Sequence, residues 1–491
     1  MPSALTTLIR GGLVLVENDH FEHVTLLVQD GLIFDIIHGD GPDDLPVMDA
    51  TGRIIIPGLV NGHTHSHGAL GRGGVAQDAT LEQFLAGAPA LNGKRTVDDL
   101  RLSAQLSAAE MIRKGCTACF DLSVELPGPS VAGLHAVAQA YFNAGMRAVV
   151  APMIADRTIY QALPGLLAAL PDDMRRVLGA MTLLPWTQTL ADCEDAFASW
   201  PVPNDHVRPG IGPAIPLHCS DEFLGACADL SARRGIPLQT HLAETRMQQV
   251  AAQQRYGTTL TSHLGALGLL SPRFSGAHGV WLDQAEAALL AQTGGGVVHN
   301  PLSNLRLGSG IAPVRALVDA GLAIGVGTDA ANTSDTQNMF EAMRLTAGLS
   351  RVHAAPDMWV SAREAFKMAT EGSARILGFD RIGRISKGWA ADLLFLDRAY
   401  CHYVPLRDVL SQIVFSENGA ALREVMIAGR IVFAENKVLT LDEAALHRAA
   451  QETAERLDAA NHDIRLLTDA AGILVRSFCH ATCTAHPQPT H

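Results

Sequence analysis

From residue 51 to about residue 380 the chain alternates between apolar runs of strand length and amphipathic stretches with helical spacing. Eight such runs occur: RIIIPGLVNGHTH, GCTACFDLS, MRAVVAPMI, VRPGIGPAI, IPLQTHLAE, FSGAHGVWLD, GGVVHNP and LAIGVGTDA. Helix boundary signals fit between them, as where Thr96 and Asp99 form a capping-box pattern and Gly115 ends the helical stretch. Eight β-then-α units predict a closed parallel (β/α)8 barrel, with an open doubly wound sheet as the alternative.

The two ends of the chain have a different pattern, in which short apolar runs are separated by tight turns. Gln29-Asp30-Gly31 and Ala428-Gly429-Arg430 are turns of this kind, as in hairpins. We expect residues 1–55 and 381–438 to pair into one small β-sandwich, around a barrel at 56–380 and before a helical extension at 439–491. The final HATCTAHPQPTH is expected to be frayed.

Composition limits the partners of the chain. With 37 Lys and Arg against 50 Asp and Glu, the formal net charge is −13, which argues against nucleic acid as a partner. The first residues lack the pattern of a signal peptide, and no run reaches the roughly 20 apolar residues that cross a bilayer. These features predict a cytoplasmic protein with no membrane partner.

The eight cysteines are scattered, which is typical of reduced thiols rather than of a disulfide framework. Cys116 and Cys119 form a C-x-x-C pattern inside an apolar run, so we expect them to pack in the core rather than to bind metal. A second metal site is conceivable in the tail, which holds Cys479, His480, Cys483 and His486, although nothing nearby fixes its geometry.

Ionisable residues stand at the carboxyl ends of four of the predicted strands. His63 and His65 are two apart and therefore point the same way, while His241, His278 and Asp329 end three other runs. In a parallel barrel these ends meet at one mouth, where active sites form. A buried aspartate is costly unless it is paired or binds a metal. Together these residues predict a metal site.

At this point the sequence resembles the amidohydrolase superfamily, in its branch of heterocycle deaminases and triazine hydrolases. The matching segments, in the family's order, are PGLVNGHTHSHGALGRG, HLAET, GAHGVWLD, HNPLSNLRLGSG and GTDAAN. The resemblance implies a TIM barrel of the amidohydrolase type with a mononuclear metal site. The implied ligands are His63, His65, His241 and Asp329, the implied proton shuttle is Glu244, and the implied second catalytic group is His278. No lysine ends VRPGIGPAI, as the binuclear members would require.

The implied chemistry is hydrolytic. One Zn²⁺ or Fe²⁺ per chain suits three imidazoles and a carboxylate, keeps a position for water, and lowers the pKa of that water to about 7. Asp329 and His278 would orient the water and share its proton. Glu244, three residues after His241, would move a proton to a ring nitrogen and then to the departing amine. Its alternative is a solvated acid at a helix start.

Candidates for substrate contact come from the same mouth, namely His67, Arg72, Gln83, His218, Asn304 and Asn332. Arg72 would hold an oxygen of the substrate, or else tie down its own loop. His67 would contact substrate or support a ligand, or else be an ordinary loop residue.

The segment GPAIPLHCS departs from relatives that deaminate adenosine-type compounds. Those relatives have a P-H-x-P-Y-x-C-S pattern, whereas Ala214 stands here at the histidine and Leu217 at the tyrosine. A purine nucleoside is therefore disfavoured as substrate. A smaller or flatter ring remains open, such as a pterin, pyrimidine, triazine or oxidised purine.

The sequence thus predicts an aminohydrolase that releases ammonia from a small nitrogen heterocycle. A cyclic amidase or a dehalogenating hydrolase on the same metal is the alternative, and only the products would distinguish them. A non-catalytic scaffold is a remote third reading, because such a scaffold would be expected to have lost at least one of the six residues. The resemblance also implies a homo-oligomer, either a dimer or a tetramer.

Overall fold

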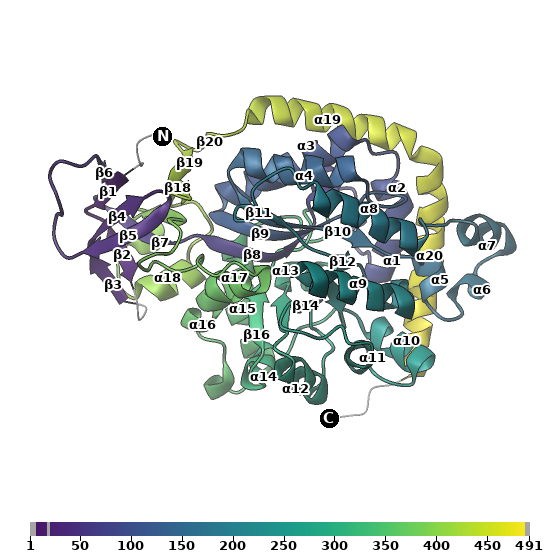
Figure 1. The fold of residues 1–491 in the computed structure, drawn as a ribbon. Helices are drawn as coiled ribbons and strands as arrows, with labels where there is room; N and C mark the ends of the chain where they lie inside the picture. Colours follow the sequence, from purple (N-terminus) through teal and green to yellow (C-terminus); the bar gives the residue numbers. More distant parts are fainter. Residues whose placement is uncertain (1–5, 17–19, 487–491) are drawn as a thin grey trace.

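The computed structural model describes residues 6–16 and 20–486 of the chain (Figure 1). Its centre is a set of parallel strands whose spatial order follows the chain. One sheet has the order β11-β10-β9-β8 and another the order β13-β14-β15-β16, while β12 pairs with β10. These strands are β8 (Leu59–Thr64), β9 (Cys116–Ser123), β10 (Arg147–Ile154), β11 (Val207–Pro209), β12 (Gly212–Pro213), β13 (Leu238–Leu242), β14 (Phe274–His278), β15 (Gly296–His299) and β16 (Ala323–Val326). The predicted parallel α/β architecture is confirmed.

Hydrogen bonds join the two parallel sheets at both seams. At one seam, Ile211 forms a parallel bridge to Leu238, and His241 N donates to Ala214 O at 3.0 Å. At the other, Asp329 N donates to His63 O at 3.0 Å. The carboxyl ends of the strands are thereby held around one mouth.

Helices cover the outside of these strands. The larger ones are α3 (Val97–Arg113), α4 (Val131–Ala144), α8 (Trp186–Ala198), α9 (Asp221–Arg234), α10 (Arg246–Tyr256), α12 (Gln284–Gln292) and α15 (Met339–His353). The shorter ones are α11 (Leu260–Ala266), α13 (Pro301–Arg306), α14 (Val314–Asp319), α16 (Ala362–Lys367), a π-helical turn (Met368–Gly372) and α17 (Ser373–Leu377). Helix α3 begins where predicted, since Thr96 and Asp99 form both bonds of a capping box.

Additional short helices lie in the loops beyond the strand ends. After β8 come a 3-10 turn (Ser66–Gly71), α1 (Leu81–Ala86) and α2 (Ala88–Asn92). After β10 come α5 (Ile159–Ala162), α6 (Leu166–Ala169) and α7 (Asp172–Gly179). These two inserted segments lie at the mouth of the barrel and supply part of the wall of the cavity described below.

Strands from both ends of the chain form two further sheets beside the barrel (Figure 1). The four-stranded sheet has the order β5-β4-β1-β6 and the seven-stranded sheet the order β20-β19-β18-β17-β7-β2-β3. Their bounds are β1 (Thr6–Arg10), β2 (Leu13–Val16), β3 (His20–His23), β4 (Thr25–Gln29), β5 (Leu32–Ile37), β6 (Val47–Asp49), β7 (Arg53–Pro57), β17 (Leu393–Asp397), β18 (Leu422–Ile427), β19 (Arg430–Ala434) and β20 (Lys437–Val438). Helix α18 (Val409–Phe415) lies between β17 and β18. The predicted domain boundaries remain a proposal.

The hairpin turns of these sheets have the backbone that their sequences predict. Asp30 and Gly31 have φ values of 52° and 80°, and Ala428 and Gly429 have values of 49° and 74°. Two consecutive residues with positive φ are typical of the tight turns that match the twist of paired strands.

Two helices end the described chain. Helix α19 (Glu443–Ala460) packs along α3, and α20 (His462–Ala485) packs on α1, α2 and α10, as the yellow segment of Figure 1 shows. The fraying predicted from His480 onward is wrong as far as Ala485, because Val475 and Cys479 are buried and anchor the last turns. Residues 487–491 of that prediction lie outside the described residues.

Cys116 and Cys119 are both free and fully buried in β9, as predicted for core residues. Among the described residues, no helix has the length and apolar character needed to cross a membrane.

Candidate metal centre

Three imidazoles and one carboxylate converge at the carboxyl ends of the strands. The Nε2 atoms of His65 and His241 lie 3.1 Å apart, and Asp329 Oδ1 lies 3.2 Å from His65 Nε2 and 3.6 Å from His63 Nε2. All four side chains are buried. In the described part of the chain, the two groups of possible metal ligands both lie here: His63, His65 and His241, and His63, His278 and Asp329. The tail residues Cys479, His480, Cys483 and His486 form no such group among these described residues.

The Nδ1 atom of each ligand-type histidine faces an oxygen. The acceptors are Gln239 Oε1 for His63 at 2.7 Å, Leu122 O for His65 at 2.8 Å and Ala214 O for His241 at 2.5 Å. An oxygen accepts, so each Nδ1 carries the proton and donates it. Each Nε2 is left with its lone pair toward the centre, which is the arrangement of imidazoles that bind a metal.

The site fits one divalent cation. The Nε2 atoms of His65 and His241 lie 3.1 Å apart and Asp329 Oδ1 lies 3.2 Å from His65 Nε2, so these atoms are close enough to bind a single ion. His63 Nε2 is also buried without a hydrogen-bond partner among the described residues. Burial and the neighbouring imidazoles hold the pKa of His241 well below its usual value, so this ring is neutral and can bind. Nitrogen and carboxylate donors suit Zn²⁺ and Fe²⁺ alike.

Asp329 is held by the backbone around it. Its φ is 61°, an uncommon value for a residue with a side chain, and such strain concentrates at functional sites. Oδ1 accepts from Ala330 N at 2.8 Å, and Oδ2 accepts from the hydroxyl of Ser303. Burial alone would raise the pKa of Asp329, but His63 and His65 hold it well below its usual value, so the carboxylate is ionised.

Glu244 and His278 face each other beside the cluster, with Glu244 Oε2 3.5 Å from His278 Nε2. Glu244 Oε1 accepts from Ser309 Oγ at 3.3 Å. Burial raises the pKa of Glu244 well above its usual value, and repulsion from Asp329 and Glu82 adds to this, against the opposing bond from Ser309. The raised pKa favours the protonated form of the side chain, as a general acid requires.

His278 is fixed in orientation by Asn304. Its Nδ1 donates to Asn304 Oδ1 at 2.8 Å, and its Nε2 has no partner among the described residues. Burial lowers the pKa of His278 to about 4, so the ring is neutral. Because His278 also belongs to one of the two ligand groups, its free Nε2 lies within reach of the cation or of a water beside it.

A cavity of about 650 Å³ opens above the cluster. His65, His241, Glu244 and Asp329 lie at its base, and His67 and His218 also line it. Most of its wall is apolar and comes from α1, α2 and the loops after β9 and β10. Such a cavity can enclose a small molecule and exclude water from it.

The structure places the predicted substrate contacts in different surroundings. His67 and His218 line the cavity, and Asn304 acts on His278 instead. Arg72 does not reach the cavity, because its half-exposed guanidinium pairs with Glu110 of α3. Gln83 points away toward Gly472 of α20, and Asn332 packs against Gly68 and Gly71 rather than lining the cavity. Arg72, Gln83 and Asn332 thus do not line this cavity, and their role as substrate contacts stays a prediction.

Several supporting residues were missed by the sequence analysis. Gln239 orients His63, Ser303 bonds Asp329, and Ser309 bonds Glu244. Gln239 stands two positions before His241 on the same strand and so faces the same side, which was an available signal. Ser303 lies beside Asn304 in α13, and Ser309 follows that helix. The sequence does not reveal how this segment folds toward the metal centre.

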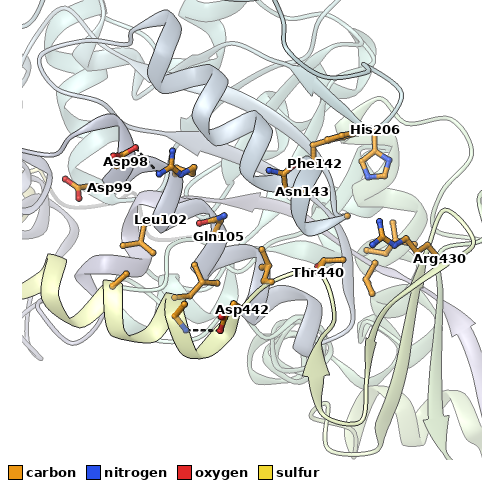
Figure 2. Close-up of a pocket in the computed structure, with 18 of the residues that line it drawn as sticks. Asp98, Asp99, Leu102, Gln105, Phe142, Asn143, His206, Arg430, Thr440 and Asp442 are labelled. Atoms are coloured by element: carbon orange, nitrogen blue, oxygen red, sulfur yellow. Dashed lines mark hydrogen bonds and ion pairs between the residues drawn. The ribbon is translucent and has the colours of Figure 1, made fainter.

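A larger groove of about 980 Å³ lies away from the metal centre (Figure 2). It runs between α3, the end of α4, the β18–β19 hairpin and the start of α19. Its acidic groups are engaged locally: Asp98 pairs with Arg101 at 2.9 Å, and Asp442 accepts from Ala445 N at 3.0 Å. None of the residues lining the groove belongs to a metal-competent group in the described part of the chain.

A parallel α/β barrel that gathers three imidazoles and a carboxylate where they can hold one divalent ion, beside a buried glutamate whose pKa is raised, defines a metal-dependent hydrolase. More specifically, the chain belongs to the amidohydrolase family, whose model, described as "Amidohydrolase family", matches residues 54–432. The resemblance drawn from the sequence is confirmed, and the protein is a hydrolase that acts on carbon–nitrogen bonds.

Known proteins similar to this chain include a 5-methylthioadenosine/S-adenosylhomocysteine deaminase of Syntrophomonas wolfei subsp. wolfei. It is 31% identical over 445 residues, which are 90% of this chain and 96% of the relative. The crystal structure of an adenosine deaminase from Xanthomonas campestris with bound zinc is 26% identical, with a TM-score of 0.81 and coverage of 92% and 98%. Atrazine chlorohydrolase from Arthrobacter aurescens TC1, complexed with zinc, is 24% identical, with a TM-score of 0.81 and coverage of 91% and 100%. These likenesses confirm the fold.

Proposed function

We propose that this protein is a metal-dependent aminohydrolase that releases ammonia from a small nitrogen heterocycle. The observation that carries the proposal is the pair Glu244 and His278, 3.5 Å apart, beside a cluster of donors that suits one divalent ion. The deaminases among its relatives support ammonia as the leaving group.

The bound ion would be held by His63, His65, His241 and Asp329. Zn²⁺ is supported by the similar structures that hold zinc, and Fe²⁺ suits the same donors. When bound, a divalent ion at this position supplies Lewis acidity and lowers the pKa of a water molecule to about 7.

The remaining residues move protons and hold geometry. Asp329 and His278, each on a fixed backbone, orient the attacking water. Glu244 can deliver a proton to a ring nitrogen, which makes the ring carbon more electrophilic. Its carboxylate can then take up the proton that the attacking water loses and pass it to the leaving amine. The apolar cavity wall excludes other water during this transfer.

Glu244→Gln tests the mechanism, because glutamine keeps the shape of the side chain and cannot transfer the proton. We expect kcat for ammonia release from the best amine in a screen of aminated pyrimidines, pterins, triazines and purines to fall about 10²- to 10⁴-fold. Elemental analysis should still find about one metal per chain. Full activity in this variant would remove Glu244 from the mechanism.

The same screen separates the rival chemistries by product. Ammonia supports the proposed aminohydrolase, whereas a ring-opened acid would indicate a cyclic amidase and chloride a dehalogenating hydrolase. Two metals per chain would also contradict the mononuclear site.

A homo-oligomeric state and a cytoplasmic location remain predictions. Analytical ultracentrifugation of the purified protein and fractionation of cells that express it would test them.

A further inference from the structure

We propose that the substrate ring carries an apolar substituent, rather than a sugar, and that this substituent fills the part of the cavity beyond the metal centre. The inference rests on the proposed function and names the class of heterocycle that the same site accepts. It is carried by the size of the cavity, by its wall and by the hydrogen bonds that its charged groups already make.

The cavity is larger than a bare ring requires. Its volume of about 650 Å³ falls in the range that holds drug-sized ligands, roughly 300–1,000 Å³. A bare pyrimidine or pterin that reached the cluster at the base would leave much of this space to water.

The space beyond the cluster has an apolar wall from three separate segments. Leu81 and Phe84 come from α1, Leu126 from the loop after β9, and Met181 and Leu183 from the segment that follows α7. All three segments follow carboxyl ends of barrel strands, so their side chains lie further from the cation than the strand-end histidines. A flexible methionine in such a wall accommodates apolar groups of varied shape.

Most of the charged side chains that line this space are engaged within the protein. Glu125 accepts from Ser130 N at 2.8 Å and from Ser130 Oγ at 2.9 Å. Arg95 donates to His67 O at 2.6 Å and to Leu91 O at 3.0 Å, and Arg157 donates to Cys219 O at 3.4 Å. Part of the acceptor capacity of Glu125 is therefore already used by Ser130. Sugar hydroxyls would lose water there without gaining an equal number of acceptors, which weakens binding.

The residues that follow the fourth barrel strand also favour an apolar substituent. Ala214 lines the cavity beside His241, where it presents a methyl group, and Leu217 is buried in the core. His218 lines the cavity as a neutral ring, since burial lowers its pKa to about 4. This side of the cavity thus adds no charge that would attract a polar substituent.

A substituent series tests the inference. Each aminated ring of the screen is offered bare, with an N-butyl chain and with an N-ribosyl group, and kcat/KM for ammonia release is measured on the zinc-loaded enzyme. We expect the butyl form to exceed both others at least tenfold, because each buried methylene contributes about fourfold. Equal or higher kcat/KM for the bare or ribosyl form would overturn the inference and leave the proposed function standing.

Binding is measured separately, so that failure of the chemistry can be recognised. Calorimetric titration of zinc-loaded Glu244→Gln with the same compounds should give a dissociation constant at least tenfold lower for the butyl form. If this preference holds while no ring releases ammonia, the proposed function fails and the inference stands. If the preference is missing, the inference is wrong whatever the products.

Matched variants at Met181 and Leu183 test whether the apolar cavity wall causes the preference for the butyl form. Met181→Gln should reduce the butyl-to-bare ratio of kcat/KM at least threefold, whereas Met181→Leu, which stays apolar at similar volume, should keep the ratio within twofold. Leu183→Asn and Leu183→Met repeat the comparison at a second half-buried position, in case one variant fails to fold. An unchanged ratio in both polar variants would show that the substituent does not contact this wall.

Discussion

At the metal centre, the residues that would bind the ion could be predicted from the sequence, whereas most of the residues that orient them could not. His63, His65, His241 and Asp329 could be proposed because each follows an apolar run and matches a known motif. Gln239 was missed although it stands two positions before His241 on the same strand, because a glutamine has no metal-ligand motif and its role depends on the distance of 2.7 Å between its Oε1 and His63 Nδ1. The surroundings of Arg72 and Gln83 could not be predicted, because nothing in the sequence shows that Arg72 pairs with Glu110 or that Gln83 lies against α20.

The role of Gln239 leads to a prediction about metal affinity. Gln239→Leu removes the acceptor that fixes the His63 ring, and loss of such a partner typically weakens metal binding about 10- to 100-fold. Competition with a zinc chelator would measure this change. Gln239→Glu keeps an oxygen acceptor and serves as the control, and equal affinities for wild type and the leucine variant would contradict the role.

Among the secondary-structure elements, the number of barrel strands and the helix caps could be predicted from the sequence. The division of the fourth strand and the helices inserted after β10 could not. The fourth strand divides into β11 and β12, because Pro209 cannot donate to the ladder and Gly210 follows it. Helices α5 to α7 form a long insertion, in which α5 and α6 have only four residues each and are too short to show a helical period. The end of α20 was expected to fray because it lies near the end of the chain, yet the helix continues to Ala485 with Val475 and Cys479 buried.

Helix α3 offers a test of a predicted local signal. Thr96 Oγ1 accepts from Asp99 N, and Asp99 Oδ2 accepts from Thr96 N at 2.7 Å. Asp99 also forms an ion pair with Arg456 of α19. Thr96→Ala removes the cap, and we expect a loss of about 1 kcal/mol, seen as a lower melting temperature in calorimetry. Thr96→Ser retains the hydroxyl and should melt close to the wild type.

On the scale of the whole molecule, the barrel and the paired end strands are joined by a buried ion pair. Arg147 of β10 meets Asp392, which directly precedes β17, with Nε 2.8 Å from Oδ2. Asp392 is 2% exposed and Arg147 8%. The sequence analysis expected the two end segments to pair with each other, but a link between residues 245 apart cannot be read from either of them alone.

This pair predicts a strong and asymmetric effect on stability. Asp392→Ala leaves the guanidinium of Arg147 buried and unpaired, which typically costs about 3–5 kcal/mol. The melting temperature should fall well below that of the wild type. Replacing both residues, as Arg147→Met with Asp392→Ala, should recover part of the loss, and a double variant less stable than the single one would contradict this account.

The pairing of β7 with β17 sets an order of events for a chain made from its amino end. Leu393 lies opposite Pro57, so the partner of the first segment emerges only after the entire barrel has been synthesised. Until then β7 presents an unpaired edge, and such an edge can capture strands of other chains. Nascent chains cut short before residue 393 should therefore be the species that chaperones must shield, even where their barrels have already closed.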